Sequence, residues 1–562
     1  MTEETVQQNP LLHGLVDIGS NGVRFSISNL DPATARILPT IFQDRAAISL
    51  YDAQFSGTTK SPISNKVIGQ ILTSMQRFKS ICHDFGVPDQ NVRVVATEAT
   101  REAQNSTEFR DRITEASGWD VELLSKSEEA RIGAEGVASS IGSVTGLVMD
   151  LGGGSTQLSW MRSEKGVCKM AGKPVSMPYG AAALTKRIET AIDAAAIGML
   201  RDEMKGRIAD AFISLQIPKD LQLDAEAEGG FTMYLSGGGF RGFGYLLLDQ
   251  HDIKPYPVPI INGFKAPGSA FSSLADLHLD PELSDRLDEK FRISGRRARQ
   301  IPAVAFLINT LIETLPKIKT VPPSPFPLPS LLLQTNPGGV REGAIFEKLP
   351  QEIRAQDPLH VATLPFAPRS AELVGPLLNY ALPRSAPFII RFETAPALSN
   401  MLIYHSNVPK ESRASCGLHS TTTGILASAH GLTHETRALL ALSLCERWGG
   451  EVSDSNLKTR LQDLVGPELS YWARYLGAIA RVVGSVYPTG IIREEKLRFF
   501  ATDEMANTGA IILKVAIRED DPTTSATMVM DSIKDLAKVG KKKRNREGFR
   551  RKVAMNLVRD LE

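Results

Sequence analysis

Two stretches decide the fold: Leu15-Val16-Asp17-Ile18-Gly19-Ser20-Asn21-Gly22, and Leu147-Val148-Met149-Asp150-Leu151-Gly152-Gly153-Gly154-Ser155-Thr156. In each, an apolar run leads into an acid and a glycine turn, and a second apolar run follows, which predicts a strand, a tight turn and a strand. Glycine has no Cβ and tolerates positive φ, so backbone N–H groups at such turns can approach a phosphate closely. The repeat therefore predicts two facing phosphate-binding turns.

The composition of the 562-residue chain is that of a multi-domain globular protein, with about three or four domains by length. The formal net charge of +1 argues against a general surface for nucleic acid or for anionic membranes. No apolar run approaches the length of a membrane span, and the first residues lack a basic start and an apolar signal core. We therefore expect a cytoplasmic location, with a nuclear one as the other default.

Cysteines and histidines are scattered along the chain. The four cysteines form no Cys-x-x-Cys pair, which disfavours a zinc site or a disulfide framework. His430 and His434 are four residues apart, but no third ligand of matching spacing accompanies them, so ordinary loop or helix-start histidines are favoured over a metal site.

The first part of the chain alternates strand and helix patterns. Apolar periodicity predicts a helix over 66–85, and strands over 14–18, 23–27 and 92–96. The pattern Ser125-Lys126-Ser127-Glu128 predicts a capped helix start. Further on, we expect a long helical region over 181–215 and a strand over 231–235 that enters a ligand-facing glycine loop, Ser236 to Gly242.

The last third of the chain changes character. A Pro-rich stretch within 321–330 predicts an extended loop, because proline lacks the N–H donor that helices and central strands need. Beyond residue 346 the pattern is mainly helical, over 435–448 and 471–486, with an α/β-like piece near 509–517. The basic run that begins at Lys541 is interpreted as a solvated tail, with a nuclear-import signal or an anionic-ligand patch as the minority interpretation.

A cleft for a polyphosphate chain needs backbone donors, cations and carboxylates that hold a divalent metal. Asp17 and Asp150 stand at corresponding turns and are candidate metal ligands, while Arg24 and Arg101 are candidate cations, since a guanidinium forks onto two oxygens. The alternative is a pair of ordinary hairpin turns with solvated acids. Two such turns in matching strand contexts make that alternative the weaker one.

Four motifs stand in the order of a known family. These motifs are Asp17-Ile18-Gly19-Ser20-Asn21-Gly22-Val23-Arg24, Val95-Ala96-Thr97-Glu98-Ala99-Thr100-Arg101-Glu102-Ala103-Gln104-Asn105, Ser127-Glu128-Glu129-Ala130-Arg131 and Asp150-Leu151-Gly152-Gly153-Gly154-Ser155-Thr156. With them, the chain resembles the exopolyphosphatase/guanosine pentaphosphate phosphatase (Ppx/GppA) family over roughly residues 12–346. Ser236 to Gly242 and Gly338 to Gly343 are similar to its later glycine loop and closing motif.

The resemblance implies an α/β fold with two ribonuclease-H-like lobes of the actin, sugar-kinase and Hsp70 superfamily, followed by a mainly helical C-terminal domain. We place the first lobe at 1–140, the second at 141–346 with the Pro-rich loop 321–330, and the helical domain with its basic tail at 347–562. The resemblance also implies that Glu129 is the catalytic glutamate, which orients and deprotonates the attacking water. From the residues alone, Glu128 and Glu129 are first-turn acids that satisfy the helix dipole.

Two departures from the family pattern affect the expected function. Gln157 stands where family hydrolases usually have glutamate, and an amide can neither act as a base nor give a metal a formal charge. Ser127 replaces the usual glycine before the paired glutamates. The two His-Asp dipeptides of the chain, His83-Asp84 and His251-Asp252, both lie before residue 347, so we expect the C-terminal domain to lack the metal site that some relatives carry there. Together these features resemble the fungal retrograde-response branch of the family, which signals from mitochondria to nucleus.

Two functions follow from this resemblance. One is a cytoplasmic regulator whose cleft binds ATP, GTP or polyphosphate with Mg²⁺ and whose surface is read by a protein partner; the other is an active Mg²⁺-dependent hydrolase that releases terminal phosphate. A scaffold with a vestigial cleft and sugar-kinase-like transfer rank lower. We expect no direct nucleic-acid or membrane binding, and a homodimer stays open. The expected phosphate- or nucleotide-binding residues are Asp17, Gly19, Ser20, Asn21, Arg24, Arg101, Gly152, Gly153, Gly154, Ser155, Thr156, Ser236, Gly237, Gly238 and Gly239.

Overall fold

The computed structural model describes residues 7–55, 60–267, 270, 295–315, 332–335, 338–504, 509–518, 527–541 and 548–559. The Pro-rich stretch 321–330 lies outside the described residues, and so do residues 542–547 of the basic run. The chain divides into two compact units. The first contains Met1–Gln250 and Ile261–Gln356, and the second contains His251–Ile260 and Asp357–Glu562. The lobe boundaries at 140 and 346 stay predictions.

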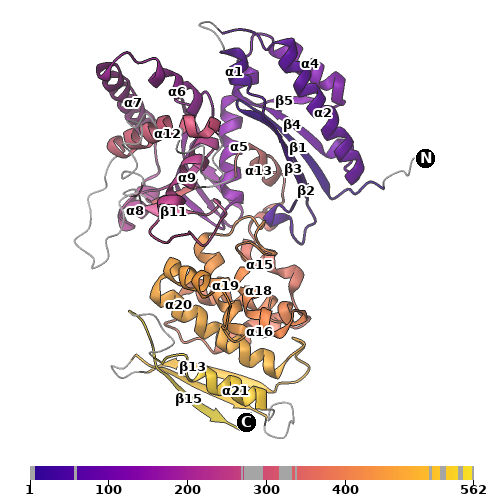
Figure 1. The fold of residues 1–562 in the computed structure, drawn as a ribbon, viewed down its shortest axis with the longest axis vertical. Helices are drawn as coiled ribbons and strands as arrows, with labels where there is room; N and C mark the ends of the chain where they lie inside the picture. The colour runs from indigo at the N-terminus through magenta and orange to yellow at the C-terminus, as the bar shows by residue number, and fades with distance from the viewer. Residues whose placement is uncertain are drawn as a thin grey trace. The chain divides into compact units, whose positions relative to one another are not determined.

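The first unit begins with a five-stranded sheet of order β3-β2-β1-β4-β5. The first three strands are antiparallel, and β4 and β5 run parallel to β1. Helices α2 and α4 cover one face of this sheet, with Phe78 and Phe109 in the core between them (Figure 1). The elements are β1 (Leu12–Gly19), β2 (Gly22–Asn29), β3 (Thr40–Ala46), α1 (Leu50–Gln54), α2 (Asn65–Phe85), β4 (Val92–Ala96), α3 (Glu98–Arg101), α4 (Ser106–Ser117), β5 (Val121–Leu123) and α5 (Lys126–Ser139).

The second lobe repeats this strand order. Its sheet runs β11-β12-β10-β6-β7-β8, in which β6, β7 and β8 are antiparallel while β10 and β12 run parallel to β6. The first three strands of each lobe thus form a meander, and two parallel strands extend it. The elements are β6 (Val144–Leu151), β7 (Thr156–Glu164), β8 (Val167–Met170), β9 (Val175–Met177), α6 (Ala181–Glu189), α7 (Ala194–Ser214), α8 (Lys219–Ala227), β10 (Thr232–Ser236), α9 (Gly238–Gln250), β11 (Lys265–Pro267), α12 (Gly295–Thr314), β12 (Leu332–Thr335), α13 (Val340–Phe346) and α14 (Gln351–Arg354).

A second core joins the two lobes. Leu15 and Val95 of the first sheet pack with Ile132 of α5, Val148 of β6 and Phe346 of α13 in one buried cluster. Burial of apolar side chains from both sheets against the same two helices supplies the main stabilisation here. Helices α5 and α13 therefore lie between the sheets (Figure 1).

Several sequence predictions are confirmed in the first unit, and two need correction. The strand over 92–96, the helix over 66–85 and the capping box at Ser125 are all present. The long helical region over 181–215 is instead two helices, α6 and α7, because Asp193 caps a new helix start by accepting the backbone N–H of Ala196. The prediction of a glycine loop from Ser236 to Gly242 is also wrong beyond Gly237, since helix α9 already begins at Gly238.

The second unit is mainly helical and ends in a small sheet. Helix α20 buries Tyr471, Trp472 and Tyr475 and packs along α19. Strands β13 and β14 are antiparallel, and β15 runs parallel to β14 after helix α21. The α/β-like end expected from the sequence is therefore present. The elements are α15 (Pro358–Thr363), α16 (Ala371–Tyr380), a π-helix (Ile389–Thr394), α17 (Ala395–Asn400), α18 (Arg413–His419), α19 (His434–Arg447), α20 (Ser455–Val486), β13 (Leu497–Asp503), β14 (Ile511–Ile517), α21 (Thr527–Leu536) and β15 (Val553–Val558).

Candidate phosphate-binding cleft

A cavity of about 540 Å³ opens between the two lobes of the first unit. Both decisive turns line it: Asp17, Ser20 and Asn21 on one wall, Asp150 and Gly152 on the other. The C-terminal end of β10 and the N-terminal end of α13 complete the wall. Of the predicted binding residues, those that line the cavity are Asp17, Gly19, Ser20, Asn21, Arg24, Gly152, Gly153, Ser155, Ser236, Gly237 and Gly238, and both Asp150 and Glu129 line it as well.

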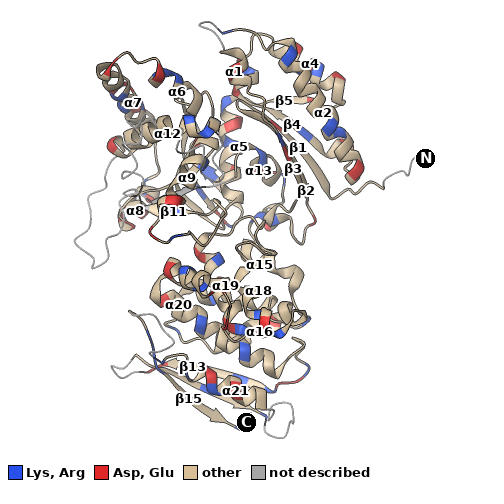
Figure 2. Ribbon diagram, in the orientation of Figure 1, with Lys and Arg blue, Asp and Glu red and all other residues tan. Residues whose placement is uncertain are grey.

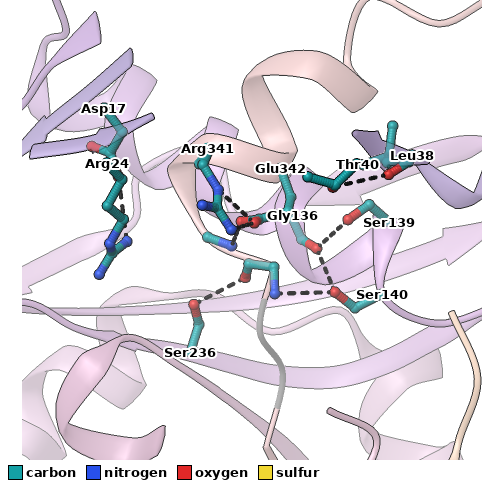
Figure 3. A network of polar contacts seen from close by, with 12 residues as sticks. Asp17, Arg24, Leu38, Thr40, Gly136, Ser139, Ser140, Ser236, Arg341 and Glu342 are labelled. Atoms are coloured by element: carbon teal, nitrogen blue, oxygen red, sulfur yellow. Dashed lines mark hydrogen bonds and ion pairs between the residues drawn. The ribbon is translucent and has the colours of Figure 1, made fainter. Parts of the chain in front are cut away.

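Asp17 sits at the end of β1 and faces Arg24 on the neighbouring strand. The two residues are register partners in the β1–β2 hairpin, and Arg24 Nη1 lies 3.3 Å from Asp17 Oδ2 (Figure 3). Asp17 is only 4% exposed. Burial raises the pKa of its carboxyl, which Arg24 and Arg341 partly offset. The pair places a buried carboxylate and a cation side by side on the cleft wall.

Asp150 occupies the matching position in the second lobe, next to Ser236 at the end of β10. Burial raises the pKa of Asp150, with the charge of Arg24 opposing this shift and the charge of Asp17 adding to it. The two aspartates thus repel each other across the cleft. A divalent cation would relieve this repulsion.

The donor set fits Mg²⁺ together with a phosphate ligand. Mg²⁺ is commonly held by one or two carboxylates, with water and phosphate oxygens completing an octahedron. In the described part of the chain, no group of three or more His, Cys, Asp or Glu side chains converges on such a site. Asp17 and Asp150 would therefore hold the ion with help from the ligand, and the ion would neutralise phosphate charge.

The second glycine turn directs its carbonyl groups away from the cleft. The oxygens of Gly152, Gly153 and Gly154 accept N–H groups at the start of α6, from Ala181, Ala182 and Gly180 respectively. Carbonyl oxygens would repel a phosphate, and these three are engaged by N–H groups at the start of α6 instead. This geometry suits an anionic ligand.

Glu129 lies in the first turn of α5 and reaches the cleft. Ser125 and Glu128 form the capping box predicted for this helix, which fixes the position of its first turn. Arg101 Nη1 donates to Glu129 Oε2 at 3.2 Å. Burial raises the pKa of Glu129 to about 7, because the charges of Asp150 and Glu98 add to desolvation and outweigh Arg101. A carboxyl with that pKa can exchange a proton near neutral pH.

Four predicted residues do not line the cavity. Arg101 supports Glu129 from behind, and Thr156 is buried with its hydroxyl donating to the carbonyl of Tyr179 at 2.8 Å. Gly154 packs against Glu98, and Gly239 lies inside α9 against Leu151. These residues shape the cleft wall from behind.

Sequence reasoning missed four arginines that line the cavity: Arg45 on β3, Arg241 on α9, Arg297 on α12 and Arg341 on α13. Burial, together with the positive charges of Arg241, Arg45 and Arg24, lowers the pKa of Arg297 to about 10. Arg241 and Arg341 lie within the motifs Ser236 to Gly242 and Gly338 to Gly343, and this position in the sequence could have identified them as cleft residues. Arg45 is the register partner of Arg24, and Arg297 had no sequence signal.

The closing motif at Gly338 is tied to the second lobe and to α5 (Figure 3). Ser236 Oγ donates to the carbonyl of Gly338 at 3.0 Å, and the N–H of Gly338 donates to Ser140 Oγ at 3.1 Å. Arg341 Nε donates to Glu342 Oε1 at 2.8 Å. This network holds the start of α13 against the cleft.

His434 begins α19, and both nitrogens of its ring have polar partners. Its Nδ1 lies 2.8 Å from the hydroxyl of Tyr256, and its Nε2 lies 2.7 Å from the carbonyl oxygen of Ile260. Both ring nitrogens are therefore used for packing the segment His251–Ile260 within the second unit. The sequence interpretation of an ordinary histidine agrees with this.

The duplicated strand order and the cleft between the lobes define a protein of the actin, sugar-kinase and Hsp70 type of fold. Residues 27–352 match the model of the Ppx/GppA phosphatase family, and residues 357–560 match that of the RTG2 C-terminal domain. The chain belongs to the Ppx/GppA phosphatase family.

Several known proteins are similar to this chain. Retrograde regulation protein 2 of Saccharomyces cerevisiae is 42% identical over 513 residues, covering 88% of this chain and 84% of that protein. The bifunctional 3-dehydroquinate synthase/phosphatase of Fusobacterium nucleatum is 24% identical over 185 residues, 32% of this chain and 27% of that protein. The solved Ppx/GppA member from Aquifex aeolicus is 21% identical, with a TM-score of 0.45, and covers 60% of this chain and 97% of its own. Among the described helices, none is long and apolar enough to cross a membrane.

Proposed function

We propose that the chain is a cytoplasmic regulator whose cleft binds a phosphate-chain ligand, either a nucleotide or polyphosphate, together with Mg²⁺. The observation that carries this proposal is the convergence of Arg24 and Arg45 of the first lobe with Arg241 and Arg297 of the second on one cavity. Four cations that repel one another there favour a ligand with several negative charges. Basic and acidic residues are otherwise interspersed over the helices of both units (Figure 2).

The regulatory role rests on similarity to retrograde regulation protein 2, which covers most of the chain. Because the contributing arginines belong to both lobes, a bound anion would draw the lobes together. It can shift an open–closed equilibrium only by the difference in its affinity for the two states. A protein partner would then read the altered surface, as expected for a signalling protein between mitochondria and nucleus.

Calorimetry with tripolyphosphate, ATP and GTP in magnesium buffer tests the binding proposal. Arg297→Gln should weaken binding about tenfold or more, since a desolvated charge-assisted hydrogen bond contributes about 1.5–3 kcal/mol. Arg299→Gln is the matched control, because Arg299 is exposed two residues further along α12. No binding of any of the three ligands to the wild type, or equal weakening by both variants, would refute the proposal.

An active hydrolase is the second candidate, favoured by the position and pKa of Glu129. A carboxyl with a pKa of about 7 on the cleft wall could orient and deprotonate an attacking water. Gln157 argues for slow turnover, because it replaces a charged family residue. The test is phosphate release from polyphosphate, compared between the wild type and Glu129→Gln. An active hydrolase should lose activity in the variant, and equal rates would exclude a role of Glu129 in hydrolysis.

A further inference from the structure

Gln157 does not line the cleft, yet it connects to the cleft wall. It lies on β7 directly opposite Asp150 of β6, and its Nε2 donates to Ser155 Oγ at 3.0 Å. Ser155 is buried, lines the cavity and is hydrogen-bonded through its side chain to Glu98. Gln157, Ser155 and Glu98 thus form a chain of polar contacts that ends at the cleft.

The chemistry of these groups fixes the direction of the chain. A serine hydroxyl has one hydrogen, an ionised carboxylate only accepts, and an amide nitrogen only donates. Ser155 therefore gives its hydrogen to Glu98 and accepts the amide hydrogen of Gln157. A glutamate at position 157 would compete with Glu98 for that single hydrogen, and it would also face the carboxylate of Asp150 across the strand pair.

The charge of Arg101 also acts on Glu98 and lowers its pKa. Arg101 lies one helical turn further along α3, and its Nε, 3.9 Å from Glu102 Oε1, has no hydrogen-bond acceptor among the described residues. Arg101 uses Nη1 to hold Glu129 at 3.2 Å. A Glu98 carboxylate released by Ser155 would turn toward Arg101 and compete with Glu129 for it.

We propose that Gln157 is a positioning residue: through Ser155 it holds Glu98 against the turn at Gly154, and so leaves Arg101 to Glu129. The tight fit at that turn supports this, since a Cβ at Gly154 would lie 2.7 Å from Glu98 Oε2. The relay is a property of the ligand-free chain, and only its effect on ligand affinity rests on the proposed function. Gln157 therefore has a positioning role in this chain, in addition to removing the charge that a glutamate would carry.

A double-mutant cycle without ligand tests the relay directly. Gln157→Met keeps the size of the side chain and removes the donor, and Ser155→Ala removes the hydroxyl. In urea unfolding at neutral pH, each should lower the folding equilibrium constant about five- to tenfold, and the double variant should lower it no further than either single one. Ser159→Ala is the matched control on the same strand, because its hydroxyl donates to the carbonyl of Trp160, and its effect should add to that of Gln157→Met.

The pH dependence separates positioning from mere packing. Glu98 is faced by Arg101 and Glu102 near α3, by Lys126 and Glu129 of α5, and by Tyr51 of α1. Because Ser155 donates to the ionised form of Glu98, the loss caused by Ser155→Ala should shrink as the pH falls and Glu98 takes up a proton. Ser159→Ala should show no such dependence. Additive losses in the cycle, or a loss for Ser155→Ala that is the same at every pH, would overturn the relay.

A binding arm tests what the relay does for the cleft. With tripolyphosphate and magnesium, Gln157→Met and Ser155→Ala should each raise Kd about tenfold, and Gln157→Glu should raise it at least as much. Wild-type affinity in Gln157→Met, or tighter binding in Gln157→Glu, would overturn the positioning role. Absence of binding to the wild type would defeat the proposed function instead, and the ligand-free cycle would still decide whether the relay exists.

Discussion

Gly153 of the second lobe touches Asn21 of the first: a Cβ atom at Gly153 would lie 3.0 Å from Asn21 Nδ2. The same atom would lie 3.0 Å from Cβ of Ser20. The two decisive turns therefore meet across the cleft. A side chain at this position would be tight against both residues, which would have to move by a few tenths of an ångström, and a ligand that bridges the turns depends on their spacing.

Gly153→Ala should weaken ligand binding while leaving the fold intact. Overpacking of this kind costs about 1–3 kcal/mol, and part of that cost can be relieved by a small opening of the lobes. We expect the affinity for tripolyphosphate, measured by calorimetry, to fall about tenfold or more, because about 1.4 kcal/mol corresponds to a tenfold change in affinity. Gly172→Ala is the control, since a Cβ there meets nothing within 4 Å. Equal affinities for the two variants would show that the contact between the turns does not govern binding.

Glu129→Gln should change how stability depends on pH. The pKa of Glu129 is about 7 in the folded chain against an ordinary value of 4.5, so the folded state retains a proton that the unfolded state has lost. This contribution is complete below the unfolded value and disappears as the pH rises through about 7. The variant lacks the titration and should gain on the wild type between about pH 5 and pH 8, by on the order of 1–3 kcal/mol.

Glu128→Gln provides the control for that experiment. Its side-chain and backbone bonds with Ser125 lower the pKa of Glu128, so its contribution to stability is present above pH 4.5 and is lost as the pH falls. The variant should therefore lose stability relative to the wild type as the pH rises. Urea unfolding at several pH values measures both variants, and pH profiles of the same sign would contradict the assignment.

The sequence predicted the two turns because their signal is local. An acid followed by glycines between apolar runs is readable within ten residues, and so are the capping box at Ser125 and the apolar face of α2. The break between α6 and α7 was not predicted, because the alanine-rich sequence favours a helix on both sides of Asp193. Local patterns thus located the carboxylates and glycines of the cleft.

The remaining parts of the cleft depend on tertiary structure. Arg45 and Arg297 are brought together by lobes that are distant in sequence, and a lone arginine has no pattern that marks it as a ligand-binding residue. The placement of His251–Ile260 in the second unit has the same character, because Tyr256 finds its partner His434 at a sequence separation of 178 residues. Similarity to a family was enough to predict the cleft, whereas the contacts within it follow only from the tertiary structure.

Tyr256→Phe should loosen the segment His251–Ile260. The Tyr256 hydroxyl is partly buried and bonded to His434 Nδ1, so its removal takes away this hydrogen bond, at a cost of about 0.5–1.5 kcal/mol. Amide hydrogen exchange should become faster in this segment and at the start of α19, while α2 stays unchanged. Tyr380→Phe is the control, because Tyr380 is largely exposed on α16. Unchanged exchange in the segment would show that this hydrogen bond does not hold it.

Gly484→Ala should destabilise the second unit, although alanine normally favours a helix. The guanidinium of Arg447 packs on Gly484 and stacks 4.1 Å from the ring centroid of Trp448, and its Nε donates to the carbonyl of Leu402. A Cβ at position 484 would overlap that buried guanidinium. We expect a loss of about 1–3 kcal/mol in urea unfolding, despite the gain of roughly 1 kcal/mol that alanine brings to a helix interior.

Two further variants make this last prediction specific. Gly198→Ala in α7 adds the same atom where nothing lies within 4 Å, and it should stabilise the chain by about 0.5–1 kcal/mol. Arg447→Met combined with Gly484→Ala should recover part of the loss, because the shorter, unbranched side chain leaves room for the new methyl group. If Gly484→Ala were as stable as the wild type, or if the combined variant were as unstable as the sum of its parts, the close packing of Arg447 on Gly484 would not be what requires glycine there.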